Sequence, residues 1–328
     1  MDEATRPPEH QGQPQQESTV PPIASPPAPT RQGLEPAWDT RHGDLYRNVK
    51  KTLLALPVNF DAEIEIAGIN ATDLFGLNSV LGSAIERNVV ETLNEFRTVW
   101  DPIGAYATYS FVRFPQSFPD VRLVDRNQDS QEPILMGIEL KGWFAFSKEQ
   151  EPSFRYEVTP LACARQDLLV VVPWVLSNVI SGKPKVLTPF VDEARYAALL
   201  RNYYWVWSRG KGKPEDQVTL SECTVPYPAK VDASSDKAVQ DSGGNFGRVA
   251  RTNLLSDFTK QTLEIDAAGI PIKYWVKFLK AFSESASGLD STIENLVKLV
   301  NKTLGPKHPN TEEIIEHLTA FLKATQKN

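Results

Sequence analysis

Apolar residues recur at intervals of three and four along residues 78–99. This spacing places them on one face of an α-helix, so the segment is predicted to be amphipathic, with one face against a core. The stripe consists of Val80, Leu81, Ile85, Val89, Leu93 and Phe96.

Four later segments have the composition or alternation of β-strands, and a short helix is expected at Thr159–Gln166, before the last of them. The order is therefore helix, three strands, helix, strand, which predicts an α/β fold with a mixed central sheet flanked by helices. The four expected strands are residues 104–114, 120–125, 134–146 and 168–174.

The regions outside this core differ in composition. Residues 1–38 contain nine prolines and almost no large apolar side chains, so we interpret them as disordered. Helical patterns return at residues 190–208, 251–285 and 289–325. The predicted organisation is a Pro/Gln-rich tail (1–44), a core (45–208), a flexible basic and Gly-rich loop (209–250) and a helical C-terminal region (251–328).

The composition excludes several kinds of chemistry. The 328 residues include two cysteines and four histidines, without zinc-ligand spacing. A disulfide framework, a zinc site and catalysis by a Ser-His or Cys-His pair are therefore not expected. The glycines near 243–247 do not form a phosphate-binding P-loop. No apolar run is long enough for a membrane span, and a secretory signal is not expected. The low cysteine count favours a reducing cytoplasm.

Net charge does not exclude a nucleic-acid partner. The chain carries a net charge of −6, but residues 1–44 hold seven acids and three arginines, or −4 of that total. The remaining chain is therefore close to neutral, and DNA binding depends on a local basic face rather than on the average.

One pair of expected strands brings three ionisable residues together. If the turn-forming residues 126–133 close a symmetric hairpin, residue i lies opposite residue 259 − i, which pairs Asp120 with Glu139. Strand alternation places Lys141 on the same face as Glu139 and turns Leu140 towards the core. Two carboxylates at a partly open site favour Mg²⁺, and the ammonium of Lys141 is suited to orient a water or neutralise developing charge.

A structural Glu–Lys pair beside an unrelated Pro-Asp turn is the alternative interpretation. The acid-x-lysine triplet at 139–141 occurs once in the chain, inside the strongest strand candidate. That placement favours a catalytic cluster.

Pro119-Asp120 followed by Glu139-Leu140-Lys141 resembles the PD-(D/E)xK nuclease superfamily, whose core has the order helix, three strands, helix, strand. The resemblance covers residues 78–174 and implies a restriction-endonuclease-like core. It implies that Asp120, Glu139 and the carbonyl of Leu140 bind Mg²⁺ and that Lys141 assists the water. It also makes Glu86, on the first helix, a possible additional acid.

Basic residues after the core are candidates for DNA contact. Residues 195–213 combine basic and aromatic side chains, although Tyr196, Leu199, Leu200, Tyr203 and Trp207 have the spacing of a core stripe, which we favour for them. The expected DNA-binding residues are Arg209, Lys211, Lys213, Arg248 and Arg251, with a solvated surface loop as the alternative for the last two.

These observations predict a Mg²⁺-dependent endonuclease acting on double-stranded DNA, of Type II-like restriction endonuclease character. Such enzymes are often homodimers, because duplex cleavage needs one site per strand. A restriction role also implies a cognate DNA methyltransferase encoded nearby. A repair or recombination nuclease of the same superfamily and a non-catalytic DNA-binding or scaffold protein are the alternatives.

Overall fold

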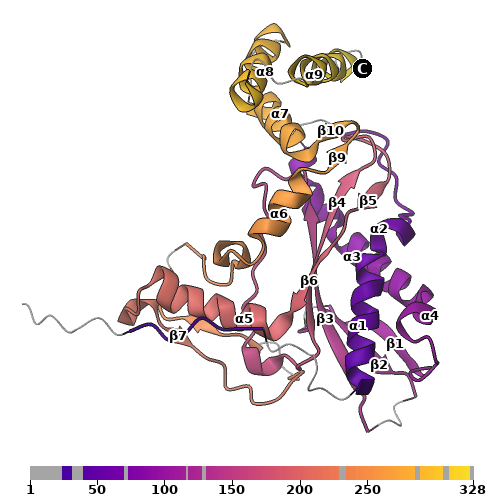
Figure 1. Cartoon of the computed structure of the whole chain (residues 1–328), viewed down its shortest axis with the longest axis vertical. Coiled ribbons are helices and arrows are strands. Elements are labelled where there is room, and N and C mark those ends of the chain that lie inside the picture. The colour runs from indigo at the N-terminus through magenta and orange to yellow at the C-terminus, as the bar shows by residue number, and fades with distance from the viewer. Residues whose placement is uncertain are drawn as a thin grey trace, which may run out of the picture.

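The computed structural model describes residues 24–31, 40–69, 73–115, 117–127, 131–228, 234–241, 243–284, 289–305 and 310–325. A mixed β-sheet lies at the centre with helices on both faces (Figure 1), which confirms the expected α/β class. The strands are β1 (Tyr109–Arg113), β2 (Val121–Asp125), β3 (Ile134–Phe144), β4 (Leu168–Leu176), β5 (Pro184–Val186) and β6 (Phe190–Glu193).

The sheet combines an antiparallel meander with one parallel step. β1 pairs with β2 and β2 with β3 in antiparallel fashion, whereas β3 and β4 run parallel. β5 and β6 both pair antiparallel with β4, along its end and its beginning respectively. The four strands expected from the sequence are therefore present, although β1 begins only at Tyr109.

β4 is an inner strand, between β3 and the edge strands β5 and β6, and its sequence suits that position. All nine residues of LLVVVPWVL are buried. Leu168, Val170 and Val172 point into one hydrophobic cluster, while Leu169 and Val171 point into a second cluster on the opposite face. A continuous apolar run is the expected pattern for a strand that is covered on both sides.

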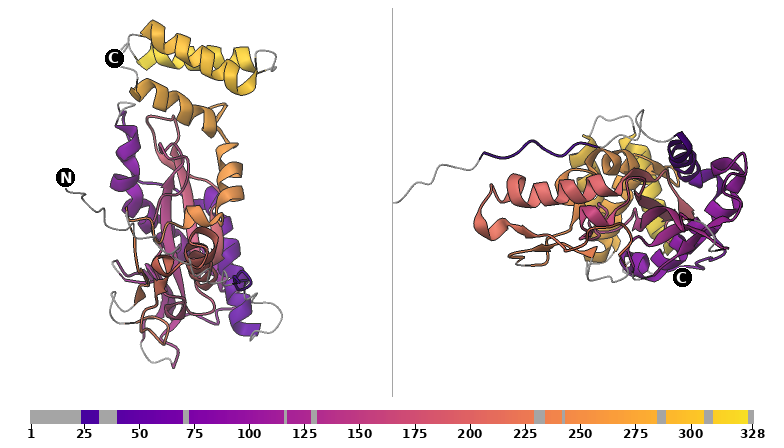
Figure 2. Two further views of the ribbon diagram at one scale, coloured as in Figure 1. Left: turned by 90° about the vertical axis from the view of Figure 1, so that its left-hand side faces the viewer. Right: turned by 90° about the horizontal axis from the view of Figure 1, so that it is seen from below.

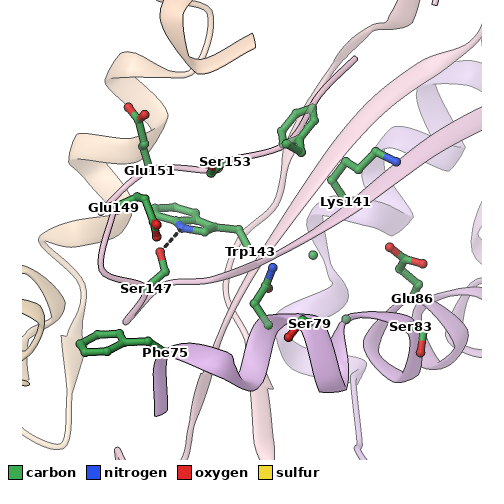
Figure 3. A pocket seen from close by; sticks show the side chains of 14 residues that line it. Phe75, Ser79, Ser83, Glu86, Lys141, Trp143, Ser147, Glu149, Glu151 and Ser153 are labelled. Atoms are coloured by element: carbon green, nitrogen blue, oxygen red, sulfur yellow. Dashed lines mark hydrogen bonds between the residues drawn. The ribbon is translucent and has the colours of Figure 1, made fainter. Parts of the chain in front are cut away.

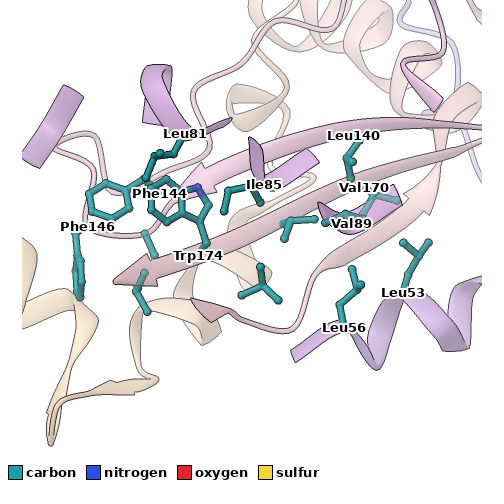
Figure 4. Packing of buried hydrophobic residues seen from close by; sticks show 14 of the residues in the cluster. Leu53, Leu56, Leu81, Ile85, Val89, Leu140, Phe144, Phe146, Val170 and Trp174 are labelled. Carbon is teal, nitrogen blue, oxygen red and sulfur yellow. The ribbon is translucent and has the colours of Figure 1, made fainter. Parts of the chain in front are cut away.

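The first face is covered by the helices that precede the sheet. The expected stripe of α3 is confirmed at Leu81, Ile85, Val89 and Leu93, which are buried against β1 and β3 (Figure 4), but Val80 is 71% exposed. Val80 lies outside the buried face, which is centred on Leu77, Leu81, Ile85, Val89 and Leu93. These elements are α1 (Thr40–Leu54), α2 (Leu56–Asn59), a 3₁₀ turn at Leu74–Gly76, α3 (Leu77–Glu95) and α4 (Arg97–Trp100).

The second face is covered by α5 (Ala194–Tyr203), which follows β6. The helix expected at 159–166 is wrong: a single 3₁₀ turn, Pro160–Ala162, stands there, and the Asp167 carboxylate accepts the N–H of Ala164. The helix expected from residue 190 was also placed too early, because residues 190–193 form β6 along the edge of β4. After Tyr203 the chain continues as a π-helix over Tyr204–Arg209.

The core face of α5 is not the predicted aromatic stripe. Its buried residues are Ala194, Ala197, Ala198 and Arg201, and the small side chains bring the helix close to the sheet. The predicted stripe Tyr196, Leu199, Leu200, Tyr203 and Trp207 is only half-buried and lies on the outer side. Both sets have helical spacing, so spacing alone does not decide which one faces the core.

Residues 209–250, expected to be a flexible loop, are anchored to the core where the structure describes them. They include a 3₁₀ turn at Pro214–Asp216, β7 (Val218–Thr219) and β8 (Lys237–Ala238). Arg201 is 2% exposed and donates to the carbonyls of Tyr156 and Val158 and to the Asp236 carboxylate, at 2.7, 3.0 and 2.6 Å. Arg201 is thus a structural residue rather than a DNA contact.

The C-terminal region is helical, as expected. α6 packs beside the sheet, and the last three helices lie beyond one end of it (Figures 1 and 2). In the described part of the chain, no helix has both the length and the apolar character needed to cross a membrane. The elements are a 3₁₀ turn at Val249–Thr252, α6 (Ser256–Leu263), β9 (Asp266–Ala267), β10 (Ile270–Pro271), α7 (Ile272–Glu284), α8 (Leu289–Leu304) and α9 (Thr311–Thr325).

The predicted tail falls only partly on described residues. Residues 1–23 and 32–39 lie outside them, so the prediction of disorder is not tested there. Residues 24–31 run without helix or strand beside α5, and α1 begins at Thr40, inside the predicted 1–44 tail.

We expect the buried ion pair of Arg201 to contribute far more to stability than the exposed pair Arg209–Asp216, which spans 3.0 Å. Asp236→Ala leaves a buried guanidinium unpaired and should lower the free energy of unfolding by about 3–5 kcal/mol. Asp216→Ala should cost less than about 1 kcal/mol. Urea unfolding of both variants measures the difference, and equal losses would contradict a structural role for Arg201.

Candidate active site

The β2–β3 hairpin has the predicted register near the site. Val121 lies opposite Ile138 and Arg122 opposite Gly137, as the relation 259 − i requires. The register shifts beyond Leu123, so the pairing is not symmetric over the whole hairpin. Asp120, immediately before β2, lies beside Glu139: its backbone N–H donates to Glu139 Oε2 at 3.3 Å.

Lys141 joins the two carboxylates. Its Nζ lies 3.0 Å from Asp120 Oδ2 and 2.8 Å from Glu139 Oε1. The side chain of Leu140 is buried in the core on the other face of β3 (Figure 4), which confirms the predicted alternation. The structure therefore brings Asp120, Glu139 and Lys141 together on one side of the sheet.

Burial controls the ionisation of this cluster. Glu139 is 7% exposed, and burial raises its pKa to about 7 against the opposing effect of Lys141. Burial alone would lower the pKa of Lys141, but the Glu139 and Asp120 carboxylates outweigh it and raise that pKa above the usual value. Lys141 therefore carries its charge at neutral pH, while Glu139 titrates close to neutrality.

Lys141 lines a cleft of about 540 Å³, whereas Asp120 and Glu139 lie behind it and are not lining residues. β2 pairs with β3 only as far as Ile138, so the following part of β3 is free on that edge, and the cleft lies between it and α3. Figure 3 shows Lys141 and Glu86 on facing elements of this cleft. The lining includes Ser79, Ser83 and Glu86 from α3, Lys141 and Trp143 from β3, and Ser147, Glu149, Glu151 and Ser153 from the following loop.

Glu86, the possible additional acid, lies in the cleft but is engaged by another partner. Arg113 Nη2 donates to Glu86 Oε2 at 3.3 Å. Burial raises the pKa of Glu86, and the negative charge of Asp120 raises it further, which places the two carboxylates within electrostatic reach. Glu86 is thus near the cluster without touching it.

A buried hydrogen-bond network positions the turn that carries Asp120. The Asp167 carboxylate accepts the N–H of Gly137 at 2.6 Å and the hydroxyl of Tyr227 at 2.6 Å, and burial raises its pKa to about 6. A Cβ at Gly137 would lie 2.2 Å from Pro119 Cγ. Pro119 therefore packs directly on the bare backbone of Gly137, which fixes the approach of Asp120 to β3.

The donor set fits a hard divalent cation, although a full cage is not present. Within the described ranges, no group of three or more His, Cys, Asp and Glu residues could hold a metal ion. Asp120 and Glu139 nevertheless point oxygens at one cationic group, the Lys141 ammonium. Mg²⁺ is commonly bound through one or two carboxylates and several waters, so two converging carboxylates suffice.

The predicted DNA-binding residues do not lie together. Arg248 donates to Ser153, a cleft residue, at 2.7 Å. Arg209 pairs with Asp216 and stacks on Trp205. It ends the π-helix that continues α5, and Lys211 and Lys213 follow it; the helix runs away from the sheet in this direction (Figure 1). Arg251 is exposed on the turn that follows Arg248.

The loop that forms the far wall of the cleft was not predicted from the sequence. Glu149, Glu151 and Ser153 follow β3 directly, in a polar segment whose only signal is its position after the strand carrying Glu139 and Lys141. Asp167, Tyr227 and Arg113 were missed as well. Their partners lie far away along the chain, so local patterns do not reveal them.

We expect Glu139 to make stability pH-dependent. Because its pKa in the folded protein, about 7, exceeds the model-peptide value of 4.5, the folded state binds more protons between these values. The free energy of unfolding should therefore fall as pH rises from 4.5 through 7, and Glu139→Gln should remove this part of the dependence. Urea unfolding at several pH values measures it, and parallel curves for both proteins would contradict the assignment.

We also expect Gly137→Ala to disturb the site. The new methyl group overlaps Pro119 and should lower the free energy of unfolding by about 1–3 kcal/mol. Gly142→Ala, on the same strand, is the matched control, because its Cβ would meet nothing closer than 3.8 Å. Thermal unfolding compares the two variants. Equal melting temperatures would contradict tight packing of Pro119 on Gly137.

Comparison with known proteins finds no matching family model, no similar curated protein and no similar solved structure.

Proposed function

We propose that the protein is a Mg²⁺-dependent endonuclease that hydrolyses phosphodiester bonds in DNA. The observation that carries this proposal is the contact of Lys141 with both Asp120 and Glu139 at the edge of a polar cleft. Carboxylates that converge on a cation beside an ammonium are the groups that metal-assisted phosphoryl hydrolysis requires.

The arrangement of the elements supports the resemblance to the PD-(D/E)xK nuclease superfamily. α3, the three antiparallel strands β1–β3 and the parallel strand β4 follow in the order that the resemblance implies. The chain departs from that order between β3 and β4, where one 3₁₀ turn replaces a helix and α5 covers the sheet face. A restriction-endonuclease-like core therefore stays a proposal, and it rests on the cluster and this strand order.

The residues of the site have separable tasks. Asp120 and Glu139 would hold Mg²⁺, together with the carbonyl of Leu140, and the metal would polarise the phosphate and lower the pKa of a bound water. Lys141, charged at neutral pH, would neutralise the phosphate and orient the attacking water. Because Glu139 must be ionised to bind the metal, apparent Mg²⁺ affinity should increase as pH rises through about 7.

Charge in the cleft also favours a metal-dependent reaction. Glu86, Glu149 and Glu151 line the cleft together with Lys141. A polyanionic substrate therefore needs additional positive charge there, which Mg²⁺ and Arg248 at the cleft loop would supply. Arg209, Lys211, Lys213 and Arg251 would contact the DNA backbone further from the reacting phosphate.

Among nucleases, we favour a Type II-like restriction endonuclease that cuts double-stranded DNA as a homodimer. Cleavage of both strands is simplest when two copies each supply one site. A cognate DNA methyltransferase would protect the host sequence. A repair or recombination nuclease would use the same residues and would give no discrete fragments.

Asp120→Asn and Glu139→Gln should each reduce DNA cleavage by about 100-fold or more, because each removes a charged metal ligand. The assay incubates unmethylated phage DNA with Mg²⁺ and resolves the products by electrophoresis, with EDTA as the metal-free control. Glu91→Gln, on the exposed side of α3, is the matched control and should cut normally.

Thermal unfolding accompanies each cleavage assay and separates catalysis from folding. Wild-type cleavage by both site variants would refute the proposal. Lys141→Met should reduce the rate while the protein stays folded; if its main effect is unfolding, Lys141 is a structural partner of buried Glu139.

A further inference from the structure

The outer face of α5 is apolar and aromatic, and a segment from the N-terminal region lies over it. Leu199, Tyr203 and Trp207 form one wall of a shallow groove of about 320 Å³, and Pro27 and Pro29 contribute to the other. In both Figure 1 and Figure 2, residues 24–31 run alongside α5. The segment therefore covers side chains that would otherwise form an exposed apolar patch.

Arg31 fastens the end of this segment. Its Nε lies 2.9 Å from Asp192 Oδ1 and its Nη2 2.7 Å from Asp192 Oδ2, a two-pronged contact with a carboxylate that is 7% exposed. The guanidinium also lies over the ring of Tyr196, 4.4 Å from its centroid. Asp192 belongs to β6 and Tyr196 to α5, so Arg31 contacts both the edge of the sheet and the helix.

The sequence of the segment suits such a surface. Proline fixes φ and restricts the preceding residue to extended conformations, so Ser25-Pro26-Pro27-Ala28-Pro29-Thr30-Arg31 has little conformational freedom to lose on docking. Aromatic-lined grooves bind proline-rich segments for this reason. Here Asp192 pairs with Arg31 at the end of the prolines.

We propose that the outer face of α5, with Asp192, is a binding site for a proline-rich segment ending in arginine, and that residues 24–31 of the same chain occupy it. The N-terminal region is then attached to the folded body at a defined point rather than free along its whole length. This proposal does not depend on the nuclease assignment, because neither Asp192 nor α5 lines the cleft.

Fluorescence anisotropy of a label at residue 28 tests this docking in the full chain. Ala28 is exposed, and both native cysteines are buried, so Ala28→Cys provides a specific thiol for a maleimide dye. The docked segment should tumble with the whole protein and give high anisotropy. Arg31→Ala and Asp192→Asn should each shift the docking equilibrium towards release by about five- to tenfold.

The double variant Arg31→Ala/Asp192→Asn should release the label no more than either single change, because both remove one interaction. Asp216→Asn, which disrupts the exposed Arg209–Asp216 pair, is the matched control and should leave the anisotropy unchanged. An excess of a synthetic peptide with the sequence of residues 24–31 should lower the anisotropy. The same peptide with glutamate in place of arginine should not.

Two outcomes would overturn the proposal. Unchanged anisotropy in Arg31→Ala would mean that the contact does not hold the segment, and this variant lies outside the folded body, so misfolding does not obscure the result. Anisotropy that rises with protein concentration would mean that a second copy, rather than the same chain, binds the segment.

Discussion

The candidate site depends on one electrostatic constraint, the burial of a carboxylate on β3, an inner strand of the sheet. Glu139 stands within the apolar run of β3 and is almost removed from water, so its charge needs compensation. The Lys141 ammonium, two residues later on the same face, provides most of it, and the N–H of Asp120 adds a hydrogen bond. The same contacts hold the Asp120 and Glu139 carboxylates close together, as the proposed metal ion would require.

The surrounding fold keeps this cluster at an open edge. β3 is longer than its partner β2, so the part of β3 beyond Ile138 borders a cleft instead of another strand. Gly137 allows Pro119 to lie against β3, and the Asp167 carboxylate accepts the backbone N–H of Gly137. Packing around a single glycine thus sets the position of Asp120 relative to Glu139.

α5 shows how one helix can serve two interfaces. Its alanines pack on the sheet, and the buried Arg201 ties the helix to the 153–158 segment and to Asp236. Its aromatic side chains face outward and meet the proline-rich segment. Each interface has its own arginine ion pair. The pair of Arg201 with Asp236 is buried, whereas Arg31 pairs with Asp192 at the surface.

The sequence by itself determined the features that local chain geometry controls. Strand alternation separates Leu140 from Glu139 and Lys141, and the short β2–β3 connection brings Asp120 opposite Glu139, because both relations follow from neighbouring residues. Only the tertiary structure decided which face of α5 is buried. It determined that α5, rather than a helix at 159–166, covers the sheet, and that the loop after β3 forms one wall of the cleft. It also decided that Arg31 meets Asp192, 161 residues away. Such choices depend on packing between distant segments, where several helical stripes satisfy the same periodicity and only the shape of the partner surface selects one.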